Sequence, residues 1–263
     1  MRLRVWQLAA ALTAIALLSG CGAHVEFSAD AKRVLVSGLK GLVVLNADGS
    51  GRKLLPNTED AAYAIWSPDG RYILYEDPDW MGNRTRSRVF LYDLQTATAH
   101  ALKGYLCAPY TFSHDSRQVV AWDAGQKCLV WVDAPSGERL LEVPCPVSPQ
   151  EPRLYWLPDR QGVVFTAQEE GGRIDVYTVE AGKVYRLSTT DDVVGVGVSP
   201  DGKQVLWARQ AGLDAHAVVT AFAYDLDART VQKLPLQVDV RDLIRRKPPK
   251  GVQTSVRVTF SPD

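Results

Sequence analysis

Three cysteines could carry redox or metal chemistry: Cys107, Cys128 and Cys145. In an oxidising compartment such residues can pair, and three of them leave one thiol over. A hairpin that turns near Ser136 would bring Cys128 and Cys145 together, while Cys107 with Cys128 is the rival pair. Either disulfide would stabilise the fold by about 3 kcal/mol through loop closure. No pair has the C-x-x-C spacing of a zinc site, so we expect no metal.

Hydrolytic chemistry would need a nucleophile, a base and an orienting group, and the sequence shows no such set. Residues 197–201, GVSPD, lack the final glycine of the G-x-S-x-G motif. The histidines are scattered through the chain at His24, His100, His114 and His216. Glu169 and Glu170 precede two glycines, a composition typical of a turn. We therefore expect no catalytic residues and no cofactor, and favour a protein that is not an enzyme.

Basic side chains gather in two long segments between apolar runs. The first segment, residues 77–88, contains Trp80, Arg84, Arg86 and Arg88. The second, residues 236–254, contains Arg241, Arg245, Arg246 and Lys247. These residues could form a basic binding rim for an acidic protein or an anionic polymer. The alternative is a pair of solvated insertions, because charged stretches are usually solvent-exposed faces.

The N-terminus has the order of a secretory signal: Arg2 and Arg4, then an apolar stretch from Val5 to Leu18. That stretch is too short to span a bilayer comfortably. Residues 18–21, LSGC, resemble the bacterial lipobox at all four positions. The resemblance implies cleavage of residues 1–20 and acylation of Cys21, with three acyl chains in that family. Gly22 is not the aspartate of inner-membrane retention, so the resemblance favours the periplasmic side of the outer membrane if the source is Gram-negative.

Composition limits the class of partner. The whole chain has 30 Lys and Arg against 30 Asp and Glu, and two of the basic residues lie in the signal segment. A nearly neutral chain lacks the basic footprint that nucleic-acid binding requires. The hydrophobic content of 46% is typical of a globular domain. We expect one domain and no nucleic-acid partner.

A short pattern recurs six times, with an aromatic or apolar residue followed by Ser or Leu and ending in Asp. The copies begin at Phe27, Trp66, Phe112, Trp156, Val198 and Phe260, with spacings of 39, 46, 44, 42 and 62 residues. Periods of about 40 to 50 residues are typical of propeller blades. Apolar runs rich in β-branched residues follow the first five copies, and each is followed by a hairpin pattern. Each repeat thus predicts four strands, A to D, with the motif as the A–B turn.

The best copy is WSPDG at 66–70 with YDL at 92–94, followed by VSPDG at 198–202 with YDL at 224–226. Pro presets φ in such a turn, Asp bonds nearby backbone, and Gly can adopt positive φ. These motifs resemble those of the TolB-like, PD40 (WD40-like) repeat family. The resemblance implies an all-β fold, a β-propeller of four-stranded blades. The third copy departs from the pattern at His114 and Ser116, and the fourth at Leu157 and Arg160, which predicts weaker turns there.

Five repeats contain all four strands, and the sixth supplies only residues 255–260. We expect the C-terminal strand to close a five-bladed ring by taking the strand A position of the first blade, because closure protects strand edges. Residues 21–31 would then be a tether and residues 32–263 the propeller. The alternative is an incomplete six-bladed propeller, and His24 to Phe27 also has the pattern of a strand A.

Together these features predict a lipid-anchored, noncatalytic propeller that binds an envelope protein or an anionic polymer. The alternative is a propeller hydrolase or lyase that acts on carbohydrate.

Overall fold

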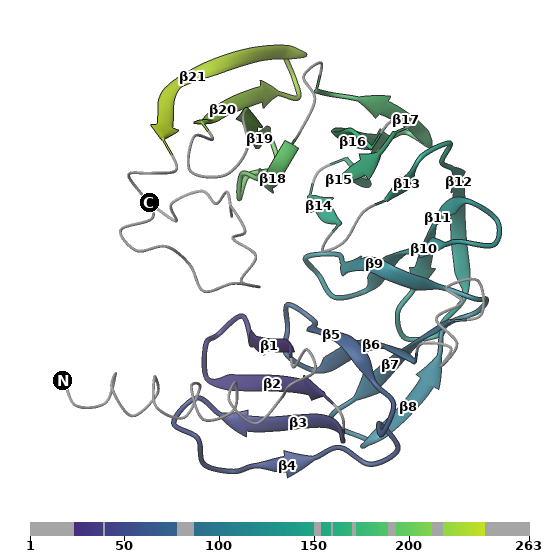
Figure 1. Cartoon of the computed structure of the whole chain (residues 1–263). Coiled ribbons are helices and arrows are strands. Elements are labelled where there is room, and N and C mark those ends of the chain that lie inside the picture. The colour runs from purple at the N-terminus through teal and green to yellow at the C-terminus, as the bar shows by residue number, and fades with distance from the viewer. Residues whose placement is uncertain are drawn as a thin grey trace. The chain divides into compact units, whose positions relative to one another are not determined.

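The computed structural model describes residues 24–38, 40–77, 87–149, 154–158, 160–169, 172–188, 193–211 and 218–239. All regular elements in these ranges are β-strands (Figure 1). Within these ranges the chain forms no helix that is long and apolar enough to cross a membrane. The chain divides into two compact units, Met1–Glu142 and Val143–Asp263, which we describe separately. We number the sheets blades 1 to 5 in chain order.

The first unit holds blades 1 and 2 and nearly all of blade 3, each an antiparallel sheet of four strands in chain order. Blade 1 consists of β1 (His24–Phe27), β2 (Arg33–Gly38), β3 (Gly41–Asn46) and β4 (Lys53–Leu54). Blade 2 consists of β5 (Ala62–Trp66), β6 (Tyr72–Asp77), β7 (Arg88–Asp93) and β8 (Thr98–Ala101). Blade 3 consists of β9 (Cys107–Phe112), β10 (Gln118–Asp123), β11 (Cys128–Asp133) and β12 (Arg139–Pro144).

The second unit holds blades 4 and 5. Blade 4 consists of β13 (Ser148–Pro149), β14 (Tyr155–Leu157), β15 (Gly162–Gln168), β16 (Ile174–Glu180) and β17 (Lys183–Arg186). Its strand A is split, because β13 and β14 both pair with β15. Blade 5 consists of β18 (Val193–Val198), β19 (Gln204–Ala211), β20 (Val218–Asp225) and β21 (Thr230–Asp239). The predicted all-β class and the repeat of four strand positions are confirmed.

Strand A of blade 1 differs from our expectation. His24–Phe27 forms β1 and pairs with β2 from His24↔Ser37 to Phe27↔Val34. This position is therefore filled by residues that we assigned to the tether, and not by the C-terminal strand. The reason is local, since the motif after Phe27 forms the same turn as the later copies and returns the chain onto β1. Residues 254–263 lie outside the described part of the chain.

The motif turns share one set of hydrogen bonds. In blade 2 the Ser67 hydroxyl donates to Asp69 Oδ1 at 2.6 Å, and Gly70 N–H donates to Ser67 O at 2.9 Å. Blade 3 keeps this geometry although Ser116 replaces the glycine, because Ser116 adopts a φ of 62°. The prediction of a weaker turn is therefore wrong for blade 3. In blade 4 the corresponding bond, from Arg160 N–H to Leu157 O, is long at 3.4 Å, as expected.

Apolar side chains pack between neighbouring blades of each unit. Blades 1 and 2 share a cluster that includes Leu35, Leu42, Ile73 and Tyr92. Blades 2 and 3 share a cluster that includes Leu74, Leu91, Leu106 and Val130. Blades 4 and 5 share a cluster that includes Val164, Val176, Leu226 and Trp207. Burying both faces of the sheets in this way explains the near-continuous apolar strands of the sequence.

Candidate binding pocket

A pocket lies between blades 4 and 5, and its first wall is the β16–β17 hairpin. The two strands pair with Thr178 opposite Tyr185 and Glu180 opposite Lys183. Two residues with positive φ, Ala181 at 48° and Gly182 at 72°, join them. A tight two-residue turn of this kind matches the twist of the strands and fixes their register. Tyr185 and Thr178 are thereby placed on the face that carries the pocket.

The second wall is the β20–β21 hairpin of blade 5. Its turn begins at Asp225, whose Oδ1 accepts the N–H of Asp227 at 2.9 Å and of Ala228 at 2.8 Å. The turn ends with Arg229 at a φ of 55°, before Thr230 pairs with Asp225. A left-handed conformation costs a residue with a Cβ about 1 kcal/mol, which is why glycine is common at such positions. Arg229 shares this conformation with eight other non-glycine residues of the described chain, among them Ala97 at the same turn position of blade 2.

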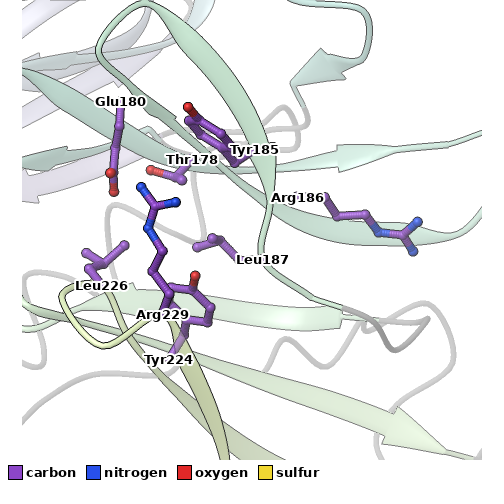
Figure 2. A pocket seen from close by; sticks show the side chains of 8 residues that line it. All are labelled: Thr178, Glu180, Tyr185, Arg186, Leu187, Tyr224, Leu226 and Arg229. Atoms are coloured by element: carbon purple, nitrogen blue, oxygen red, sulfur yellow. The ribbon is translucent and has the colours of Figure 1, made fainter.

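The pocket has an apolar floor and aromatic walls. Its volume is about 110 Å³. The floor is formed by Leu187 and Leu226, which are 5% and 3% exposed, and the walls by Tyr185 and Tyr224. Figure 2 shows the Arg229 side chain reaching up between these walls toward Glu180, while Arg186 points away from the pocket. The Arg229 guanidinium lies 5.9 Å from the centre of the Tyr185 ring, within cation–π range.

The charges around the pocket are unevenly paired. The Arg160 Nη1 atom lies 3.9 Å from Glu180 Oε2, and the same guanidinium also forms an ion pair with Asp227. Among the described residues, neither Arg229 nor Lys183 has an ion-pair partner. Two cations therefore remain uncompensated beside two carboxylates that share one arginine. This arrangement favours an acidic group on whatever occupies the pocket.

The opposite face of the same hairpin carries a closed polar cluster. Asp175 is fully buried, accepts the Ser188 hydroxyl at 2.6 Å and pairs with Arg186 at 2.6 Å. Glu169 lies 3.6 Å from Arg186 and accepts the hydroxyl of Tyr177. Burial, followed by the bond to Glu169, raises the pKa of Tyr177. The two carboxylates are held by one cation and by hydroxyl donors, so we infer that this cluster stabilises the blade.

The described residues assemble no catalytic set. His100 Nε2 lies 3.3 Å from the carbonyl oxygen of Ala134, and His114 is an exposed residue of a motif turn. The Ser199 hydroxyl is bonded to Asp201 at 2.5 Å within a motif turn. No group of three or more metal-ligating side chains occurs within the described ranges.

One predicted rim residue lies in the described structure. Arg88 begins β7 opposite Asp77, and its guanidinium lies 5.1 Å from the centre of the Phe90 ring. Burial, and then the charge of Asp60, raise the pKa of Asp77, while Arg88 opposes them. The other rim residues lie outside the described residues: Trp80, Arg84, Arg86, Arg241, Arg245, Arg246 and Lys247.

The three internal cysteines are buried, and none of them forms a disulfide. The predicted bond between Cys128 and Cys145 is thus not formed in this structure. The rival pair is also unbonded, because Cys107 lies opposite Trp122 and Cys128 opposite Asp123, neighbours on β10 whose side chains point to opposite faces. Burial, and then the charge of Asp123, raise the pKa of Cys128 to about 11. Cys21 lies outside the described residues.

Sequence reasoning missed the pocket. The sequence feature that marks the pocket is Arg229. It is the fourth residue after Asp225, and the corresponding residue after Asp133 in blade 3 is Gly137. A large charged residue where a turn favours glycine could have marked the site before the structure was known.

Solved structures share the fold. Hydrazine synthase from Kuenenia stuttgartiensis matches with a TM-score of 0.59 and 16% identity, over 81% of this chain and 65% of that one. The β-propeller domain of the Trilobed protease from Pyrococcus furiosus matches with 0.54 and 17%, over 81% and 70%. TolB from Acinetobacter baumannii matches with 0.51 and 20%, over 81% and 52%. The chain spans less than two thirds of the hydrazine synthase and TolB chains.

No protein-family model matches the sequence, and no curated protein matches it. At these identities the structural likeness concerns the fold alone. The chain has a β-propeller fold of the kind found in TolB, which confirms the predicted architecture.

Proposed function

We propose that this chain is a lipid-anchored propeller of the cell envelope that binds a partner protein without catalysing a reaction. The observation that carries the proposal is the pocket between Tyr185 and Tyr224, with its buried floor and the unpaired Arg229. Its volume of about 110 Å³ is well below the 300–1,000 Å³ typical of small-molecule sites. A pocket of this size suits one protruding side chain of a larger partner.

The character of the pocket favours a protein over an anionic polymer. Tyrosine and arginine are the residue types that contribute most to protein interfaces, where they surround a small desolvated centre. A repeating polymer would be held by a row of cations, whereas the described residues place Arg229 and Lys183 beside an apolar floor. The absence of a catalytic set among the described residues supports a binding role.

The anchor in this proposal is Cys21, whose acylation is inferred from the lipobox pattern. More than one acyl chain gives stable membrane attachment, which a single chain does not. The Cys21→Ser variant should lose palmitate labelling and move from the membrane fraction to the soluble fraction. Persistent labelling of that variant would refute the anchor without bearing on the pocket.

Site-specific photo-cross-linking tests the binding role in cells. A benzophenone amino acid replaces Tyr185, which is 38% exposed, or Tyr105, which is 57% exposed and lies far from the pocket in the sequence. We expect a discrete protein adduct from position 185 that position 105 does not give. Equal adducts at both positions, or none at 185, would contradict the proposal.

A further inference from the structure

The free edge of blade 4 lies beside the pocket. β17 is the last strand of its sheet, and Leu187 N–H donates to Val176 O at 2.8 Å. In an antiparallel pair, alternate residues bond to the neighbouring strand. Lys183 and Tyr185 are separated from Leu187 by an even number of residues, so their backbone N–H and C=O groups also point toward β16. The backbone N–H and C=O groups of Val184 and Arg186 therefore point away from the sheet.

These four outward groups have no hydrogen-bond partner among the residues that the structure describes. They alternate as donor and acceptor along the strand, as an added β-strand requires. A chain of sugar rings offers no such spacing of amide groups. The edge therefore matches the backbone of an extended peptide.

The pocket would select the side chains of such a peptide. Tyr185 and Leu187 project on the pocket face, and a strand added beside them would place every second side chain on that face. One apolar side chain could lie over Leu187 and Leu226 between the tyrosines. The next side chain on the same face would lie close to Arg229, where an acidic group gains a charge-assisted hydrogen bond.

The corresponding edge of blade 2 differs in the turn that lies beside it. Just beyond β8, Lys103 N–H donates to Gly137 O at 3.1 Å, and His100 contacts Ala134 O. The turn of blade 3 thus lies against the end of that strand, although the outward N–H and C=O groups of Ala99 and Ala101 on β8 also lack a hydrogen-bond partner among the described residues. At β17 the equivalent turn carries Arg229, and a pocket remains between the turn and the strand.

We propose that β17 accepts an extended segment of a partner protein as an added strand, with an apolar side chain in the pocket and an acidic side chain two residues away beside Arg229. This inference rests on the proposed binding function and names the form of the partner. It requires that the backbone of Val184, and not only the side chains of the pocket, take part in binding.

Selection of random linear peptides displayed on phage against the full-length chain, purified in detergent, tests the inference. We expect the enriched peptides to share an acidic and an apolar residue two positions apart. Their affinity should fall about tenfold or more in Val184→Pro, which removes one outward N–H without a bond to β16. It should fall similarly in Arg229→Gly, whereas Val184→Ala should bind as the wild type does.

A second series guards against a Val184→Pro variant that does not fold. N-methylation of the selected peptide at alternate positions should abolish binding, and N-methylation at the intervening positions should be tolerated, because only one set faces β17. No enriched peptide, or binding that ignores both the proline and the methyl groups, would overturn strand addition. If the Tyr185 adduct nevertheless forms in cells, the proposed function stands and only the mode of binding is wrong.

Discussion

Two hairpin turns of this molecule have the same construction and opposite consequences. In blade 3, Asp133 begins a turn whose fifth residue is Gly137, at a φ of 71°. In blade 5, Asp225 begins a turn whose fifth residue is Arg229, at a φ of 55°. In both, the aspartate side chain accepts backbone N–H groups of the turn.

The difference between glycine and arginine decides what lies between the turn and the preceding blade. A Cβ added to Gly137 would lie 3.4 Å from Ala101 O, an ordinary contact distance, so the turn lies against the end of β8. Arg229 holds a larger side chain between its turn and β17, over the ring of Tyr185. The pocket lies at the turn whose left-handed position holds an arginine, whereas the same position of the blade 2 turn holds Ala97.

The largest effect should follow from giving the blade 3 turn the residue of the blade 5 turn. Gly137→Arg combines left-handed strain with disruption of the bond from Lys103 N–H, so we expect a loss of about 3 kcal/mol in the free energy of unfolding. Urea unfolding monitored by tryptophan fluorescence measures it. A loss no larger than that of Gly49→Ala, at an open glycine, would show that close approach at Gly137 is unimportant.

The reverse exchange should stabilise the protein. Arg229→Gly relieves the left-handed strain, and we expect a gain of about 1 kcal/mol in the free energy of unfolding. The matched control is Ala97→Gly in blade 2, whose turn has the same position at a φ of 56° and starts from Asp93. Similar increases in the free energy of unfolding for both variants would show that the strain comes from the turn conformation. A decrease for Arg229→Gly would show that the Arg229 side chain stabilises the fold.

A smaller effect on acid stability should appear in the motif turns of blades 3 and 5. The hydroxyls of Ser113 and Ser199, followed by backbone N–H groups, lower the pKa of Asp115 and Asp201 below the usual 3.8. Because the folded pKa is depressed, this stability is present at neutral pH and is lost as pH falls through the acid range below 3.8. Unfolding measured from neutral pH down to about pH 3 should show less acid sensitivity in Ser113→Ala and Ser199→Ala. An unchanged pH profile would mean that these bonds do not persist in solution.

The blades could be predicted from the sequence, but the pocket could not. The motif turns were predictable because their bonds join residues within six positions of one another, as in Ser67 to Tyr72. Pocket residues Tyr185 and Arg229 are far apart in the chain and meet only through packing between two sheets. The expectation of a weak turn at Ser116 was wrong because Ser116 adopts a φ of 62° and its N–H keeps the bond to Ser113 O, although this conformation costs a residue with a Cβ about 1 kcal/mol.

The most direct test of the central claim measures binding and stability on the same variants. The partner captured at Tyr185 is purified and titrated against the full-length chain, its Arg229→Gly variant and its Ala97→Gly variant. We predict that Arg229→Gly raises the midpoint of thermal unfolding yet weakens the partner about tenfold or more, while Ala97→Gly leaves the affinity unchanged. Retention of wild-type affinity by Arg229→Gly would contradict the account.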